Sequence, residues 1–174
     1  MKINVAIAAA ARKNFASMPD LPRPDTGRAF AGKYVVIPYD LCVASEQGVI
    51  DPPEVKIVSI SRLIKYYAWE KYTLKQMKKH FARWPGFRFL EGKKFFAYME
   101  RYLEDGPVPV MVIKNLNGTL AVVDGNHRLA AAHFSGAKKI KAYIWDVKNI
   151  EGVLFTRDKR SKPFPLIRNM RDEK

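Results

Sequence analysis

The chain has 174 residues, of which 31 are Lys or Arg and 17 are Asp or Glu, so its formal net charge is +14. Hydrophobic residues make up 48% of the sequence, which is enough for a packed core and excludes a wholly disordered chain. No window holds the roughly 18 consecutive apolar residues of a membrane-spanning helix, so no membrane partner is expected. The charge predicts an anionic partner, and a basic surface that only maintains solubility is the alternative.

The sequence contains one cysteine, Cys42, which rules out an internal disulfide bond and a paired-cysteine metal site. We therefore expect a soluble protein of the reducing cytoplasm. The start, MKINVAIAAAARKNF, imitates a secretion signal, but Asn4 interrupts its apolar run, and Arg12 and Lys13 stand where small cleavage-site residues belong. An alanine-rich helix or an arm is the expected structure, and an uncleaved signal is the alternative.

The N-terminal third is predicted to combine an arm, a strand and a loop. Residues 1–33 are basic and rich in proline, which favours extended backbone outside the core. The segment KYVVIPYDLCV (33–43) is rich in β-forming residues, and Pro38 is expected to end this strand or place it at a sheet edge. The polar stretch SEQGVIDPPE that follows predicts a loop, a common location for functional side chains.

The segment from Val55 to Leu103 is predicted to be mainly helical, with helices over roughly 59–81 and over KKFFAYMERYLE (93–104). The first helix alternates aromatic and basic residues, which leaves two interpretations open. Its aromatic rings can stack the bases of a single-stranded nucleic acid, or they can form the buried face of an amphipathic helix. Its candidate nucleic-acid-binding residues are Lys71, Lys75, Lys78, Lys79 and Arg83.

Residues 107–145 carry the clearest secondary-structure pattern. PVPVMVIK and TLAVV are predicted to pair as strands, and the Asn117-Gly118 sequence between them is typical of a two-residue hairpin turn. A short helix is expected over 128–134 with Gly136 as its C-terminal cap, followed by an alternating strand over 140–145.

This order of elements predicts an α+β fold class, with a small mixed β-sheet flanked by helices. The expected domain covers residues 34–150 and includes a helical insert at about 59–104. Residues 151–174 are predicted to form a basic tail.

The turn DGNHR (124–128) has the features of a phosphate site. Gly125 allows the backbone to approach a ligand closely, and the following helix start presents N–H groups and the positive end of the helix dipole. Arg128 adds a cation, and Asp124 could hold a magnesium ion that bridges phosphates. The alternative is an internal ion pair between Arg128 and Asp124 or another carboxylate.

The stretch VVDGNHRLAAAHFSGAKKIKAYI resembles the ParB/sulfiredoxin superfamily, in which a strand ends in a Gly-x-[His/Arg]-Arg turn before an alanine-rich helix, a glycine and a further strand. VVIPYDLCVASE is similar to the opening strand of that family. The superfamily includes CTP-binding partition proteins, ATP-dependent sulfinic-acid reductases, free-serine kinases and proteins described as nucleases. The resemblance therefore implies a fold more strongly than it implies a reaction.

Departures from the family patterns narrow the expected activity. Asn126 stands where sulfiredoxins have their catalytic cysteine, and no helix-turn-helix region follows as in partition proteins. The Asp-Gly-His-His-Arg pattern of the serine-kinase-like branch is nearest, with Asn126 as the one change. That resemblance implies that Asp124, His127 and Arg128 surround nucleotide phosphates. It also implies that Glu46, after the first strand, is the catalytic base.

The expected function is a magnesium-dependent phosphotransferase or NTPase that uses ATP, ADP or CTP and acts near nucleic acid. Its candidate catalytic residues are Glu46, Asp124 and His127, and its candidate phosphate-binding residues are Gly125, Asn126, His127 and Arg128. Two alternatives stay open: a nucleic-acid-binding protein or nuclease with the same fold, and a catalytically inactive inhibitor or adaptor that binds protein.

Overall fold

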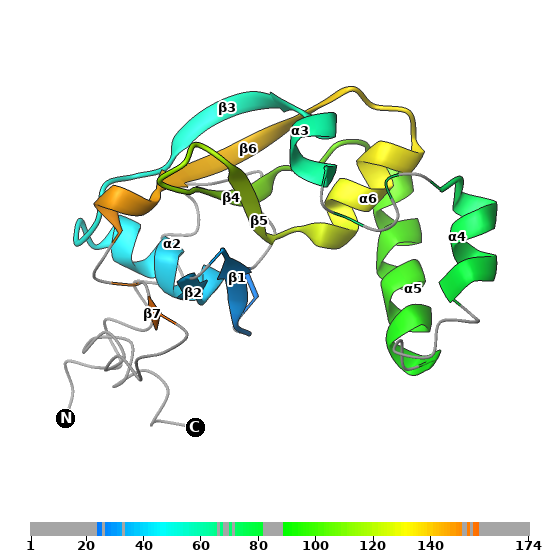
Figure 1. Ribbon diagram of the computed structural model, residues 1–174, viewed down its shortest axis with the longest axis horizontal. Coiled ribbons are helices and arrows are strands. Elements are labelled where there is room, and N and C mark those ends of the chain that lie inside the picture. Colours follow the sequence, from blue (N-terminus) through cyan, green and yellow to red (C-terminus); the bar gives the residue numbers. More distant parts are fainter. Residues whose placement is uncertain are drawn as a thin grey trace. The chain divides into compact units, whose positions relative to one another are not determined.

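The computed structural model describes residues 24–25, 27–32, 34–65, 67, 70, 72–81, 89–150, 153 and 155–156 (Figure 1). It confirms the expected α+β class, with two small sheets and several helices. No helix within these ranges is long and apolar enough to cross a membrane. The signal-like start of the chain lies outside the described residues.

The chain divides into two compact units. The first, which we call the core unit, comprises Met1–Glu54, Met111–Asp124 and Tyr143–Lys174. The second, the helical unit, comprises Val55–Val110 and Gly125–Ala142. The predicted helical insert at about 59–104 therefore falls within one unit.

Within the described residues, seven strands form two sheets, whereas a single mixed sheet was predicted. The smaller sheet has the order β1-β2-β7 with antiparallel pairing, and the larger has the order β3-β6-β4-β5. Two strands of the smaller sheet come from the predicted arm and tail. The strands are β1 (Ala29–Ala31), β2 (Tyr34–Val36), β3 (Glu54–Ser59), β4 (Val110–Lys114), β5 (Leu120–Asp124), β6 (Lys139–Asp146) and β7 (Phe155–Thr156).

The predicted strand over 33–43 is correct only in its first half. β2 ends at Val36, and α2 (Pro38–Glu46) begins at Pro38. Proline suits the first turn of a helix because its fixed φ is helical and its missing N–H would have no partner there. The apolar residues that follow face the core from a helix, so the predicted loop start at Ser45 and Glu46 is wrong as well.

The predicted helix over 59–81 is confirmed only at its two ends, because the described residues 65, 67, 72 and 73 in its middle are not helical. The β-branched residues Val55, Ile57 and Val58 lie in β3, which is followed by the short helix α3 (Ile60–Ile64) and, after a break, by α4 (Leu74–Phe81). A capping box starts α4, because the Thr73 hydroxyl accepts from the Gln76 backbone N–H and the Gln76 side-chain oxygen Oε1 accepts from the Thr73 backbone N–H. This Thr-x-x-Gln signal marks the break in the sequence itself.

The second predicted helix is confirmed and extends further toward the N-terminus, as α5 (Phe89–Asp105). Met99 is fully buried on its inner face, and Phe95 and Phe96 are half-buried. α5 packs against α6 (Asn126–Phe134), whose three consecutive buried alanines allow close approach of the two helices (Figure 1).

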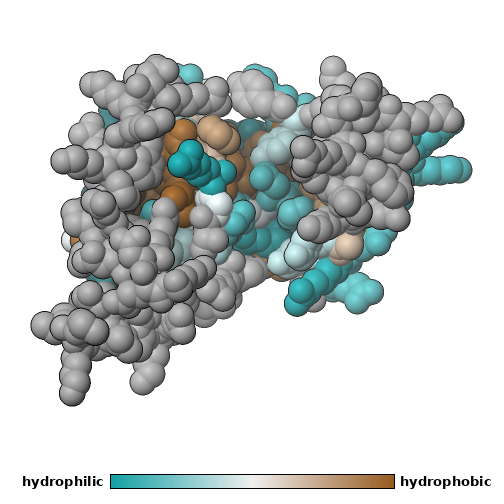
Figure 2. Space-filling model, turned by 90° about the horizontal axis from the view of Figure 1, so that it is seen from below, coloured by the Kyte–Doolittle hydropathy of each residue, from teal (hydrophilic) through white to brown (hydrophobic). Residues whose placement is uncertain are grey.

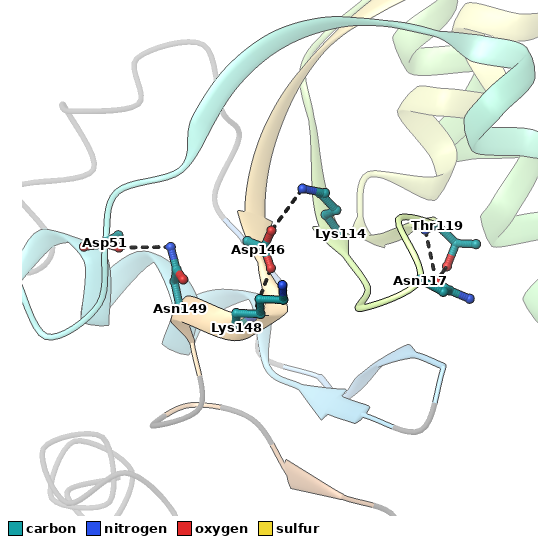
Figure 3. Close-up of polar contacts among 7 residues, drawn as sticks. All are labelled: Asp51, Lys114, Asn117, Thr119, Asp146, Lys148 and Asn149. Atoms are coloured by element: carbon teal, nitrogen blue, oxygen red, sulfur yellow. Dashed lines mark hydrogen bonds and ion pairs between the residues drawn. The ribbon is translucent and has the colours of Figure 1, made fainter.

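The predicted hairpin is confirmed, but its turn is longer than two residues. β4 and β5 pair with Lys114 opposite Leu120, and the Asn115 N–H donates to the Thr119 carbonyl at 2.8 Å. Gly118 has a φ of 78°, and the Asn117 side chain accepts from the Thr119 N–H and hydroxyl (Figure 3). This three-residue loop with a left-handed glycine is the next commonest hairpin connection.

The helix and strand after the hairpin are confirmed. α6 ends in a Schellman motif at Gly136, whose φ is 83°, with the Ala137 N–H bonded to the Ala132 carbonyl at 3.0 Å. β6 follows, but its residues 142–145 are all buried instead of alternating. β6 is an interior strand of its sheet, so both of its faces can be covered.

The core unit is held together by one apolar cluster around Trp145. The Trp145 indole N–H donates to the Ser45 hydroxyl at 2.8 Å, which satisfies the polar atom of this buried ring. The other members come from all three chain segments of this unit: Ala31, Val36, Leu41, Cys42, Ala44, Ile50, Met111, Ile113, Val123, Tyr143, Val147, Ile150 and Val153.

Candidate functional site

The turn before α6 is opened by a glycine in the left-handed region. Gly125 is the N-cap residue with φ 96° and ψ 24°, and it offers no side chain to cap the helix. The first hydrogen bond of the helix runs from the Leu129 N–H to the Gly125 carbonyl at 2.8 Å. The backbone N–H groups of Asn126, His127 and Arg128 precede this first hydrogen bond, so the helix itself offers them no acceptor.

Gly125 is required by packing as well as by its backbone angle. A Cβ atom at this position would lie 2.9 Å from Val110 Cγ1 and 3.0 Å from both Arg128 Cζ and Nε. Real Cβ contacts are essentially never shorter than 3.0 Å. The glycine therefore lets Arg128 fold back under the turn.

Arg128 is 4% exposed, and its guanidinium Nη1 donates a hydrogen bond to the Pro109 carbonyl. The sequence predicted that Arg128 contacts the phosphate directly. Such a contact would have to be made by a side chain that is almost completely buried. Its positive charge nevertheless lies within the first turn of α6, where it adds to the positive end of the helix dipole. The guanidinium of Arg128 therefore lies beside the turn, close to the backbone of Gly125.

Asn126 is the exposed residue of the turn, and its Oδ1 accepts a hydrogen bond from the Tyr67 hydroxyl. Burial raises the pKa of Tyr67 to about 12, so the hydroxyl keeps its proton at neutral pH. Tyr67 is one of the aromatic residues of the segment 59–81 whose rings were predicted either to stack bases or to face the core. No local pattern could reveal a contact between residues 59 positions apart.

His127 packs against α5. Its ring centroid lies 4.9 Å from that of Phe95 and 5.2 Å from that of Tyr98, with interplanar angles of 47° and 44°. These contacts give the imidazole a structural role beside two aromatic rings, and its catalytic role stays a prediction. Tyr98 is 49% exposed despite this contact.

The two candidate carboxylates lie in the core unit. Asp124 is the last residue of β5, is half-buried, and directly precedes Gly125 in the chain. Glu46 is the last residue of α2, with its Oε2 atom buried. Its role as a base therefore still rests on the resemblance. Among the described residues, no three His, Cys, Asp or Glu side chains are grouped to hold a metal ion.

The candidate nucleic-acid residues on α4 differ in their surroundings. Lys75 and Lys79 are exposed. Lys78 forms an ion pair with Glu100, and its Nζ lies 5.8 Å from the centre of the Phe96 ring. Lys71 and Arg83 lie outside the described residues. Among the described residues, Lys75 and Lys79 are thus the lysines of α4 that form no ion pair with a carboxylate.

Charge is distributed unequally between the two units. The helical unit holds 16 Lys and Arg against five Asp and Glu, a formal charge of +11 by sequence. Residues 34–54, 111–124 and 143–150 of the core unit hold two against six, a formal charge of −4. Figure 2 shows one face of the molecule, on which hydrophilic residues (teal) and hydrophobic residues (brown) lie side by side.

Both lysines of these core-unit ranges lie beside Asp146 (Figure 3). Lys114 Nζ lies 3.1 Å from the Asp146 carboxylate, which also accepts from the Lys148 backbone N–H. These bonds hold the pKa of Asp146 below its ordinary value, the Lys148 N–H being the largest cause. The same part of the chain therefore compensates its cations internally.

No family model, curated protein or solved structure matches this chain. Conclusions about its function rest on the residues and geometry described above.

Proposed function

We propose that the turn of Gly125, Asn126, His127 and Arg128 binds the phosphate groups of a nucleotide (ATP, ADP or CTP). The protein would then be a magnesium-dependent phosphotransferase or NTPase of the ParB/sulfiredoxin type. The observation that supports this proposal most strongly is the start of α6, where a left-handed glycine leaves the helix without a side-chain cap above the buried cation of Arg128.

The energetics favour an anion at this position. A negative charge at a helix N-terminus is stabilised by about 0.3–1 kcal/mol at an exposed site and up to about 2 kcal/mol when partly buried. The Arg128 guanidinium increases that attraction without having to leave its bond to the Pro109 carbonyl. In this proposal the backbone amides and Asn126 contact the phosphate, and Arg128 acts through its charge.

Magnesium fits the proposal as a partner of the phosphates. Mg²⁺ is often held by one or two carboxylates together with phosphate oxygens and water, and Asp124 would supply one such carboxylate next to the turn. When bound, the ion would neutralise part of the phosphate charge. Glu46 is kept as the proposed base on the strength of the family resemblance.

The decisive variant is Asn126→Asp. Aspartate has the same shape, keeps the acceptor for the Tyr67 hydroxyl, and suits a helix N-terminus, so the fold should be retained. Its negative charge would repel phosphate. We expect calorimetry with ATP, ADP and CTP in the presence of magnesium to show binding to the wild type and at least a roughly tenfold loss in the variant.

Asn117→Asp is the matched control, because it makes the same change in the hairpin loop of the core unit and keeps the bonds that Asn117 accepts from Thr119. It should bind nucleotide like the wild type. Absence of nucleotide binding by the wild type, or equal binding by Asn126→Asp, would refute the proposal.

A second function, binding of nucleic acid, is favoured by the +11 formal charge of the helical unit. A mononucleotide neutralises only a few of these charges, whereas a nucleic-acid strand presents phosphates at regular intervals. A nuclease or a phosphotransferase acting on nucleic acid would combine both functions.

A further inference from the structure

We infer that the helical unit binds single-stranded nucleic acid, with Lys75 and Lys79 on its phosphates and Tyr98 stacked on a base beside the turn. This inference rests on the proposed phosphate site and names its substrate class: a nucleic-acid strand rather than a free metabolite. The residues that support it lie in the helical unit.

The first step is the position of the cations. α4 places Lys75 and Lys79 four residues apart, which puts them on one side of the helix, while Met77 is fully buried on another. Both lysines are exposed, and the unit around them carries far more positive than negative charge. Such a surface attracts a polyanion through counterion release.

The second step is an exposed aromatic ring beside the turn. Tyr98 is 49% exposed on α5, and its ring lies 5.2 Å from that of His127, the second residue of α6. A large aromatic side chain left half in solvent is available for stacking on a base. A base stacked on Tyr98 would bring its strand next to the amides of the turn.

The combination favours a single strand over a duplex or an acidic protein. Lysines hold the phosphates of single and double strands alike, but a duplex keeps its bases stacked inside. An acidic peptide would use the lysines and has no base for Tyr98. The exposed ring of Tyr98 beside the turn therefore favours an unpaired strand, whose bases are available for stacking.

The third step concerns Lys78, which serves as an internal control. Its ammonium is engaged by Glu100 and lies near the Phe96 ring, so a phosphate would have to compete with that carboxylate. Lys75, Lys78 and Lys79 share one helix and one side-chain type. Their contributions to binding are nevertheless expected to differ.

The test is fluorescence anisotropy with a labelled single-stranded oligonucleotide and its duplex, at about 50 and 200 mM salt. We expect Tyr98→Ala to weaken single-strand binding roughly 5- to 150-fold, as loss of one stacked base predicts, and Tyr98→Phe to restore it. The double variant Lys75→Gln/Lys79→Gln should reduce the slope of log affinity against log salt by about 1.4 for the single strand, and Lys78→Gln by less than about 0.7.

Three results would overturn the inference: equal affinity for single strand and duplex, indifference to Tyr98→Ala, or equally effective competition by polyglutamate. Tyr98 and both lysines are exposed, and circular dichroism of each variant verifies that the fold is retained.

The Asn126→Asp variant separates the inference from the proposed function. Loss of both magnesium-nucleotide and single-strand binding in that variant supports both. If the variant loses nucleotide binding while the wild type binds no oligonucleotide, the proposed function stands and the inference fails. If the wild type binds oligonucleotide but no nucleotide, the nucleotide proposal fails and the surface on α4 and α5 stands.

Discussion

The helical unit of this protein and the central ranges of its core unit carry net charge of opposite sign. In the core unit, residues 34–54, 111–124 and 143–150 are acidic overall, and their two lysines lie beside one carboxylate, Asp146. The helical unit carries +11 and leaves Lys75 and Lys79 in solvent. By sequence, the +14 of the whole chain is the sum of +11 in the helical unit, +7 in residues 1–33 and 151–174, and −4 in these core-unit ranges.

This difference has an energetic side. Like charges on one small unit repel each other and reduce its stability, while the core unit gains from an apolar cluster centred on Trp145. A surface that retains unfavourable charge is better explained by an anionic partner than by stability. Two pairs of matched substitutions and a change of pH test this contrast. They are given from the largest expected effect to the smallest.

The largest effect is expected from replacing matched glycines in the two units. Gly118 and Gly125 both have positive φ, but a Cβ at Gly118 meets nothing within 4 Å, whereas one at Gly125 lies 2.9 Å from Val110. Gly118→Ala should lower the free energy of unfolding by about 1 kcal/mol and Gly125→Ala by about 3 kcal/mol. Urea denaturation measures both, and equal losses would contradict the packing described for the turn.

A smaller effect, of opposite sign in the two units, is expected from neutralising an exposed lysine. Lys75→Gln should raise the free energy of unfolding by about 0.3 kcal/mol because it relieves repulsion, and Lys114→Gln should lower it by about 0.3 kcal/mol because it removes an ion pair with Asp146. Both differences should shrink at high salt. Thermal denaturation at two salt concentrations measures them, and equal signs would undermine the contrast.

The smallest effect is expected from mild acidification, which should act on the helical unit first. Burial lowers the pKa of His133, and Glu70 opposes this shift. A histidine with a depressed pKa contributes stability that is present above its unfolded value of 6.5 and is lost as pH falls through that value. Melting temperature should therefore decline on acidification through this range, and His133→Gln should remove that part of the decline.

Asp146 provides the comparison in the core unit. Its pKa is also lowered, so its stabilisation is present above its ordinary value of 3.8 and is lost only as pH falls below that value. Asp146→Asn should leave the pH dependence near 6.5 unchanged.

Local signals predicted the fold well from the hairpin onward. The glycines at 118 and 136 mark turns whose geometry depends on few neighbours, and the apolar spacing of α5 is a property of that segment alone. The errors arose where one residue type fits two structures. Pro38 both ends a strand and begins a helix, and the run of lysines and aromatic residues before α4 concealed β3 and the capping box at Thr73.

The residues of the site could be predicted from the sequence, but their burial and their contacts with distant residues could not. Gly125 and the helix start after it follow from the DGNHR pattern. The burial of Arg128 under the turn, the hydroxyl of Tyr67 on Asn126 and the ring of Tyr98 beside His127 depend on how distant segments pack. No spacing along the chain encodes those contacts.

The reactivity of Cys42 toward a thiol reagent can be used to measure local unfolding of the core unit. It is the one thiol of the sequence, and it is fully buried among the apolar side chains of α2 and its neighbours. A thiol reagent can reach it only when this packing opens, so the labelling rate follows the local unfolding equilibrium. The labelling rate of Cys42 can thus verify that the core unit stays folded when exposed lysines or aromatic residues of the helical unit are replaced.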